Sequence, residues 1–270
     1  MGAALEVITG FATAPGTTFT ALTMAAGNSA TIRNTPLDKK IALLTLWVDN
    51  QAAGTFRVRS PKLHDNVQGI RVDVTASDVV ELMPAGVGQR LFPQDLLTLE
   101  ITGSATAGDV ETAALLVWYE DLPGQAARLI GIDELNKRGQ YLIGVENTLA
   151  LGTAGGYSGE EAVNVEFDLF KANTDYALVG YLVDTEAAVI RWRGADTGNL
   201  GVGGPGNETL RHVTSEWFAR LTRVFNMPLI PVFNSANRAG ILLDGAQDEN
   251  GADPTVTSLF VELSPAAPGR

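Results

Sequence analysis

Short runs in which apolar and polar residues alternate dominate the chain. In one run Ile70, Val72 and Val74 alternate with charged or hydroxyl-bearing side chains. A period of two places one set of side chains on each face of a strand, as in half-buried antiparallel sheets. Further runs, separated by clusters of Gly, Asn, Asp and Pro, lie at 97–102, 163–169 and 190–193. The pattern predicts an all-β fold of sandwich or barrel type.

Three segments depart from this alternation. An Asp and a Glu three residues apart have the spacing of a capping box, which predicts a short helix over 78–83. Apolar residues at helical spacing predict a second helix over 215–225, which ends before Pro228. A third helix is expected over 125–138, with Gly139 as its C-terminal cap.

The third segment lies near the middle of the chain and follows a Pro-Gly pair, which is typical of a domain boundary. We therefore expect an N-terminal domain over 1–124, a helical linker over 125–145 and a C-terminal domain over 146–270. Each domain has about 125 residues and roughly eight strand candidates.

The two halves share sequence patterns. IALLTLWVDNQAA from Ile41 and YALVGYLVDTEAA from Tyr176 agree at six of 13 positions. The same order then continues in both halves with an arginine-containing strand, a short helix and a later strand at Leu96 or Leu229. Final apolar runs at 115–117 and 259–261 close the two halves. The pattern favours an internal duplication over two sandwiches that converged on one topology.

Charge limits the surfaces that the chain offers to partners. The 270 residues include 19 basic and 31 acidic residues, for a net charge of −12. A direct nucleic-acid interface is disfavoured, because phosphate binding needs positive surface. Charged residues make up 19% of the chain, against roughly 25% in an average soluble domain. Two small domains expose much surface, so the deficit indicates surface covered by other copies of the chain.

The content of reactive residues excludes several kinds of site. Without cysteine, the chain cannot build a disulfide framework, a thiolate zinc site or a cysteine nucleophile. The two histidines, His64 and His212, lie far apart in sequence, which excludes a multi-histidine metal site. No apolar run approaches the roughly 18 residues that span a bilayer. We expect neither an enzyme nor a resident cofactor.

Two segments resemble ligand-binding loops. GVGGPG at 201–206 has G-x-G-x-x-G spacing, but a dinucleotide site needs a parallel strand and a helix around this turn. A surface loop, flexible or ordered by a neighbouring subunit, is the favoured interpretation. The acidic loop 244–253 offers oxygen ligands of the kind that calcium takes, but it lacks EF-hand spacing. A solvated hairpin loop is favoured there.

Single candidates for catalysis are weak. His64 and Asp65 are adjacent, and neighbours on a strand point to opposite faces. Ser158 lacks the second glycine of a nucleophile elbow. Asp49 and Asp184 recur at equivalent positions of the two halves, which indicates a structural role at a turn. We therefore assign no catalytic, cofactor-binding or metal-binding residue.

The tryptophans and arginines have both structural and functional interpretations. Trp47, Trp118, Trp192 and Trp217 could stack on sugars, but their strand and helix contexts favour core packing. The basic residues are 14 Arg and 5 Lys. Interfaces between proteins favour Arg over Lys, although a GC-rich genome produces the same bias.

Two tandem eight-stranded sandwiches with a helical linker, in a small acidic chain, resemble the double jelly-roll major capsid proteins of tailless icosahedral viruses. The resemblance covers the whole chain and rests on architecture, because no short motif here is diagnostic. It implies two tandem jelly rolls, trimers that form pseudo-hexameric capsomers, and in many members an internal membrane beneath the shell. The first 32 residues contain no Lys or Arg, which departs from a basic membrane-touching arm.

The resemblance implies a structural virion protein that is made in the host cytoplasm and assembles into a capsid. Its expected partners are further copies of itself and other virion proteins, without direct nucleic-acid binding. The alternative is a carbohydrate- or receptor-binding β-sandwich protein. A bicupin enzyme also duplicates a jelly roll, but two separated histidines cannot supply its clustered metal ligands.

Overall fold

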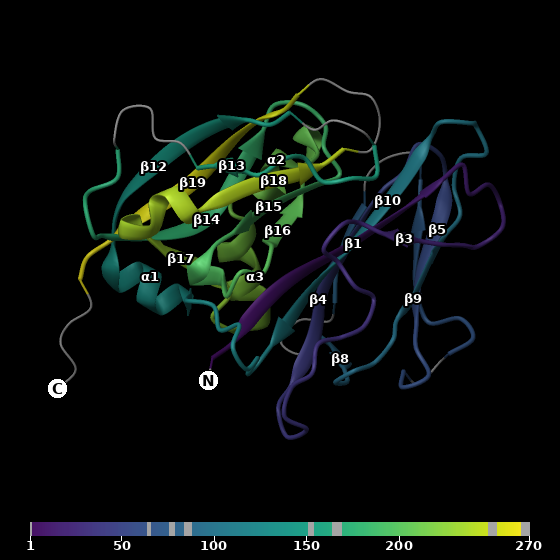
Figure 1. The fold of residues 1–270 in the computed structure, drawn as a ribbon, viewed down its shortest axis with the longest axis horizontal. Coiled ribbons are helices and arrows are strands. Elements are labelled where there is room, and N and C mark those ends of the chain that lie inside the picture. Colours follow the sequence, from purple (N-terminus) through teal and green to yellow (C-terminus); the bar gives the residue numbers. More distant parts are fainter. Residues whose placement is uncertain are drawn as a thin grey trace.

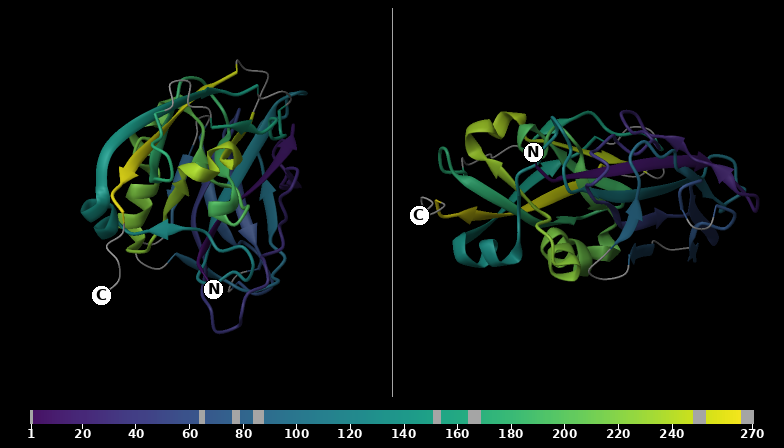
Figure 2. Two further views of the ribbon diagram at one scale, coloured as in Figure 1. Left: turned by 60° about the vertical axis from the view of Figure 1, so that its left-hand side comes forward. Right: turned by 90° about the horizontal axis from the view of Figure 1, so that it is seen from below.

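The computed structural model describes residues 2–63, 66–75, 79–83, 88–150, 154–163, 169–247 and 253–265. The fold is mostly β and is built from antiparallel sheets. Figure 1 shows two lobes, with strands β1 to β10 in a first half and β11 to β19 in a second half. The two further views in Figure 2 show the same division.

Two facing sheets form the first half. One has the strand order β3-β1-β10-β4-β7, with β8 also paired to β4, and the other has the order β2-β9-β5-β6. The strands are β1 (Ala4–Thr13), β2 (Thr20–Ala21), β3 (Thr23–Met24), β4 (Ile41–Asp49), β5 (Gly54–Arg59), β6 (Ile70–Val74), β7 (Val79–Leu82), β8 (Gln89–Leu91), β9 (Thr98–Ile101) and β10 (Val110–Tyr119).

The second half repeats this plan. Its sheets have the orders β11-β17-β14-β19-β12 and β13-β18-β15-β16. The strands are β11 (Leu129–Ile130), β12 (Gly139–Thr148), β13 (Glu161–Ala162), β14 (Asp175–Val183), β15 (Val189–Arg193), β16 (Val202–Pro205), β17 (Ile230–Asn234), β18 (Leu242–Ala246) and β19 (Thr255–Leu263).

The strand order is the same in both halves. With β3, β8 and β11 set aside, the described residues form eight strands in each half, and in chain order one sheet is 1-8-3-6 and the other is 2-7-4-5. The repeated sequences begin β4 and β14, which are the third strand of each half. Leu44 in β4 and Val179 in β14 fall at the same place of that repeat, and the register with the eighth strand shifts at each of them.

One part of the expected repeat is wrong. Leu96 precedes β9, the seventh strand of the first half, whereas Leu229 precedes β17, the sixth strand of the second half. The two therefore occupy different sheets. The counterpart of β9 is β18.

The helices differ in part from the expectation. Helix α3 (Trp217–Phe225) confirms the expected helix there, and it follows the short α2 (Arg211–Thr214). Helix α1 (Ile132–Arg138) is shorter than expected. Gly139 is its C-cap, as predicted, with an extended backbone that begins β12. The segment 125–145 thus holds β11, α1 and part of β12. No helix among the described residues is long and apolar enough to cross a membrane.

The helix expected over 78–83 is absent, because Val79–Leu82 forms β7 instead. This strand pairs with β4, with Val80 opposite Trp47. Pairing with a long apolar strand outweighs the local capping pattern of an Asp and a Glu. Asp78 itself lies outside the described residues.

The sheet of β1, β10 and β4 is buried on both faces. Every residue of β4 and β10 is buried, which explains the apolar runs at 41–44, 46–48 and 113–118. One face packs on the other sheet of the first half, and the opposite face packs on the second half. The face of β1, β10 and β4 that points away from the other sheet, and packs on the second half, is called the outer face of the first half. The equivalent side of β12, β19 and β14 is called the outer face of the second half.

Candidate functional site

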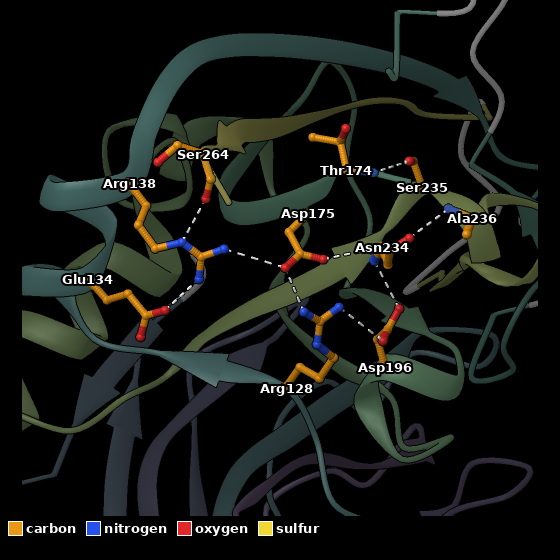
Figure 3. Close-up of polar contacts among 10 residues, drawn as sticks. All are labelled: Arg128, Glu134, Arg138, Thr174, Asp175, Asp196, Asn234, Ser235, Ala236 and Ser264. Carbon is orange, nitrogen blue, oxygen red and sulfur yellow. Dashed lines mark hydrogen bonds and ion pairs between the residues drawn. The ribbon is translucent and has the colours of Figure 1, made fainter. Parts of the chain in front are cut away.

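A polar pocket lies at one end of the second half, near the start of β14 (Figure 3). Its volume is about 490 Å³. Its lining residues are Arg138, Gln140, Asn173, Thr174, Asp175, Asn234, Glu262, Leu263, Ser264 and Pro265.

Asp175 is the centre of this pocket. Its carboxylate accepts hydrogen bonds from Arg128 at 2.7 Å and from the Asn234 amide at 2.8 Å, and the Arg138 guanidinium lies 3.5 Å away. Burial raises the pKa of Asp175, but the bonds from Arg128 and Asn234 outweigh it, so the pKa lies below its usual range. The bond to Asp175 in turn raises the pKa of Arg128.

The other charges of the pocket are also paired within the chain. Arg138 donates to Glu134 at 2.6 Å and to the carbonyl of Ser264 at 2.9 Å, as Figure 3 shows. Lys171 donates to Glu262 at 2.6 Å. These bonds tie α1 and the end of β19 to β14 and β17, so the pocket acts as a clamp. It holds no paired nucleophile and base.

The second region with functional potential is the contact between the two halves. The Trp47 indole donates to the carbonyl of Ala188 at 3.0 Å, and its ring meets Trp217 edge-on at a centroid distance of 6.1 Å. The backbone N–H of Val7 donates to the carbonyl of Gly201 at 2.8 Å. Trp47 and Val7 are almost completely buried, so the contact is shielded from solvent to the same degree as the core of either half.

An arginine pair recurs at equivalent places in both halves. In the first half Arg57 donates to Glu100 at 2.8 Å and lies over the ring of Phe19. In the second half Arg191 donates twice to Asp244, at 2.6 and 2.8 Å, and lies over the ring of Tyr157. In each half the arginine is on the fourth strand, the carboxylate is opposite it on the seventh, and the aromatic ring follows the first strand.

The two copies of this arrangement differ in what lies beyond them. The Tyr157 hydroxyl is hydrogen-bonded to the Thr9 hydroxyl of the first half at 2.6 Å. Burial raises the pKa of Tyr157 to about 12, so the hydroxyl is neutral at pH 7. Phe19 has no hydroxyl and is only half-buried. One copy thus joins the halves, and the other is open.

The glycine-rich segment GVGGPG forms β16 at this contact, so its interpretation as a surface loop is wrong. Val202–Pro205 is buried and antiparallel to β15, so these residues of the motif lie within an antiparallel strand and not in the turn after a parallel strand that a nucleotide site needs. The indole of Trp217 donates to the carbonyl of Gly203 at 2.9 Å. A Cβ at Gly204 would overlap the Trp217 ring and the Tyr181 hydroxyl. Glycine therefore permits the close approach of the backbone to Trp217.

The acidic residues that the sequence offered as candidates form bonds that stabilise the fold or are buried in it. Asp244, at the start of the acidic loop, is bonded to Arg191, and 248–252 lie outside the described residues. Asp184 accepts from the backbone N–H of Thr255 at 2.6 Å, as expected of a turn residue. Asp49 is buried at the end of β4. The described residues contain no cluster of three His, Cys, Asp or Glu that could hold a metal.

The remaining candidates also lack catalytic geometry. The Ser158 hydroxyl bonds to backbone groups of Gly159 and Gly245, and His64 and Asp65 lie outside the described residues. All four tryptophans are buried, with Trp118 the most accessible at 7% exposure. This confirms the core-packing interpretation. Sequence reasoning missed the role of β16, although four glycines in six residues are compatible with a close backbone approach.

Comparisons with known proteins place the chain in no family. No protein-family model matches it, and no curated protein is similar to it. Among solved structures, the PBSX exported protein XepA has a TM-score of 0.25 and 9% identity, over 95% of this chain and 86% of that chain. YhaK from Escherichia coli has a TM-score of 0.23 and 10% identity, over 97% and 86%. Likenesses this distant carry no functional argument.

Proposed function

We propose that the chain is a double jelly-roll capsid subunit whose function is self-assembly into an icosahedral shell. The observation that carries the proposal is the strand order, 1-8-3-6 facing 2-7-4-5, which occurs twice in one chain. A jelly roll is a sandwich of two four-stranded sheets with this kind of order. The register shifts at Leu44 and Val179 and the repeated arginine pair support duplication of one such unit.

The pairing of charged side chains within the chain and the buried apolar contact support an assembly role. In the pocket around Asp175 the charges are paired with one another, and the contact between the halves buries apolar surface. The low charged fraction of the chain fits surfaces that other copies cover. In this proposal the chain forms trimers with six lobes, resides in the virion, and contacts further capsomers and other virion proteins.

Light scattering of the purified chain at micromolar concentration, over a range of salt and divalent cation concentrations, tests the proposal. We expect a trimer with interfaces above roughly 2,000 Å² each, and shell fragments or particles by negative-stain electron microscopy. A stable monomer under every ionic condition contradicts the proposal.

A further inference from the structure

We propose that the outer face of the second half binds the first half of a second copy, and that this contact repeats the one between the two halves of a single chain. The inference rests on the proposed assembly role, and it identifies the surfaces that carry it. Two faces at equivalent positions have different surroundings: one is covered within the chain, and the other is exposed along β12 and half-buried along β19.

The repeated sequences of β4 and β14 fix which residues correspond. Trp47 on β4 corresponds to Leu182 on β14. Trp47 is opposite Ala114 and thereby in line with Thr9, while Leu182 is opposite Thr257 and in line with Glu146. Glu146 is therefore the counterpart of Thr9. The same registers make Gly144 the counterpart of Val7.

The bare face has the character of an interface. In the first half Thr9 and Val7 are 1% exposed, because the second half covers them. On β12 the equivalent side is exposed, with Leu142 at 64%. The neighbouring residues that point to this side from β19 are half-buried and uncharged, and they are Thr255, Thr257, Leu259 and Val261. Figures 1 and 2 show β12 on the side of the molecule away from the first half.

Helix α1 contacts the end of this face, at β12 and β19. Among the described residues the sheet ends at β12, so no described strand lies beside one edge of this ten-residue strand. In the first half the corresponding edge of β1 is bonded to Gly201 through Val7, and β3 pairs with the end of β1. An exposed edge strand with apolar neighbours is a ready site for protein contact.

The covering surface of the second half has an exposed counterpart in the first half. Three second-half residues are hydrogen-bonded to Thr9, Trp47 and Val7, namely Tyr157, Ala188 and Gly201. By the sequence repeat and the sheet registers, their counterparts are Phe19, Ala53 and Gly69. Ala53 is exposed, and Phe19 and Gly69 are partly exposed.

The contact between copies thus has three expected points. Phe19 of one copy meets Glu146 of the next, Ala53 meets Leu182, and Gly69 meets Gly144. The charges agree with the first point, because Arg57 lies over the Phe19 ring and Glu146 is acidic.

The contact joins two different surfaces, so it is heterologous and can close into a ring. Within the chain one lobe presents its covering surface to the other. Between chains the same step is repeated, and a trimer therefore has six lobes, with one contact inside each subunit and one between each pair of neighbours. This arrangement leaves neither outer face bare.

Cross-linking tests the first contact point, and the absence of native cysteine makes it clean. The variants Glu146→Cys and Phe19→Cys are oxidised separately, as a mixture, and combined in one chain. We expect no cross-link from either alone, a covalent dimer from the mixture, and a covalent trimer from the double variant. The control mixture, Glu146→Cys with Leu37→Cys, uses an exposed residue outside the expected contact.

A second variant tests the contact without cross-linking. Ala53→Arg places a charge opposite the apolar Leu182, and we expect at least a tenfold weaker trimer in sedimentation equilibrium. The matched control Ala239→Arg changes an exposed alanine in the second half, outside the contact, and should leave the trimer unchanged. Thermal unfolding of each variant at low concentration verifies that the subunit still folds.

The outcomes separate this inference from the proposed function. A wild-type trimer that tolerates Ala53→Arg and gives no mixed cross-link leaves the assembly role intact and overturns the assigned surfaces. Cross-links from Glu146→Cys alone also overturn them, because they indicate a symmetric contact of β12 with itself. A wild-type chain that is monomeric in all conditions overturns both proposals.

Discussion

The two halves have one strand order but different outer faces. In the first half β1, β10 and β4 are buried from both sides, whereas β12 in the second half is largely exposed. The large aromatic Trp47 occupies the covered face, and the half-buried Leu182 occupies its counterpart. Equivalent positions in one fold can therefore differ in burial. Whether a neighbouring element covers a face determines whether large apolar side chains on that face are buried.

Replacing Trp47 should have the largest effect on this comparison. Trp47→Ala removes a buried indole and its hydrogen bond, so we expect a loss of about 3–5 kcal/mol in the free energy of unfolding. Leu182→Ala, at the equivalent place on the bare face, should cost the isolated chain about 1 kcal/mol or less. Urea denaturation of both variants measures the difference. Equal losses would show that the contact between the halves adds no stability.

The arginine pairs give a second contrast. Asp244→Ala leaves the Arg191 charge buried without its partner, and we expect a loss of about 3–5 kcal/mol. Glu100→Ala should cost about 1 kcal/mol or less, because Arg57 and Arg59 can reach water. Burial raises the pKa of Glu100, but its bonds to Arg59 and Arg57 bring it below the usual range.

The double variant Arg191→Met, Asp244→Leu is the control for this pair. It removes both charges together, so most of the stability lost in Asp244→Ala should return. Chemical denaturation compares the three variants. If the double variant is as unstable as Asp244→Ala, the loss arises from packing around the pair and not from an uncompensated charge.

The Tyr157 hydroxyl offers a smaller effect. Tyr157→Phe removes the hydrogen bond to Thr9 and should cost about 1 kcal/mol. The reverse change at the counterpart, Phe19→Tyr, should leave the stability of the isolated chain unchanged, since no residue of the same chain corresponds to Thr9 there. Thermal unfolding of each variant measures both changes in stability. Destabilisation by Phe19→Tyr would contradict the open surroundings of Phe19.

The clamp around Asp175 should contribute to stability at neutral pH and lose this contribution in acid. Because the folded-state pKa of Asp175 is lowered, its stabilising contribution is complete above the unfolded pKa of about 4 and is lost as pH falls through the folded value. Asp175→Asn should therefore flatten the fall of the melting temperature below about pH 4. Melting curves between about pH 2 and 7 test this, and an unchanged acid slope would exclude a role for Asp175.

Sequence patterns predicted the elements that bury one face in a core, because burial of one face gives a regular spacing of apolar residues. β6, β9, β15 and α3 follow from residue spacing alone. The strand β7 could not be predicted, because its Asp-Glu spacing is a local helix signal and its pairing with Trp47 and its neighbours is a long-range contact. The role of β16 was hidden for a similar reason. Glycine is typical of loops and of tight contacts alike, and only the position of Trp217 distinguishes them.

For the candidate site, the sequence limited only the residue types available. The chain has no cysteine and two histidines, so we expected neither a cysteine-based site nor a multi-histidine metal site. The partner of Asp244 could not be inferred, because Arg191 is 53 positions away and its register depends on the sheet.

The covalent path through α1 gives the contact inside the chain a different dependence on protein concentration from any contact between chains. A tether converts the first into an intramolecular event, with an effective concentration that reaches millimolar for a short linker. That contact forms at any dilution, while a contact of the same design between subunits must overcome the loss of translational freedom. In the proposed assembly, a subunit built in this way stays folded when dilute, and oligomers accumulate only above a threshold protein concentration.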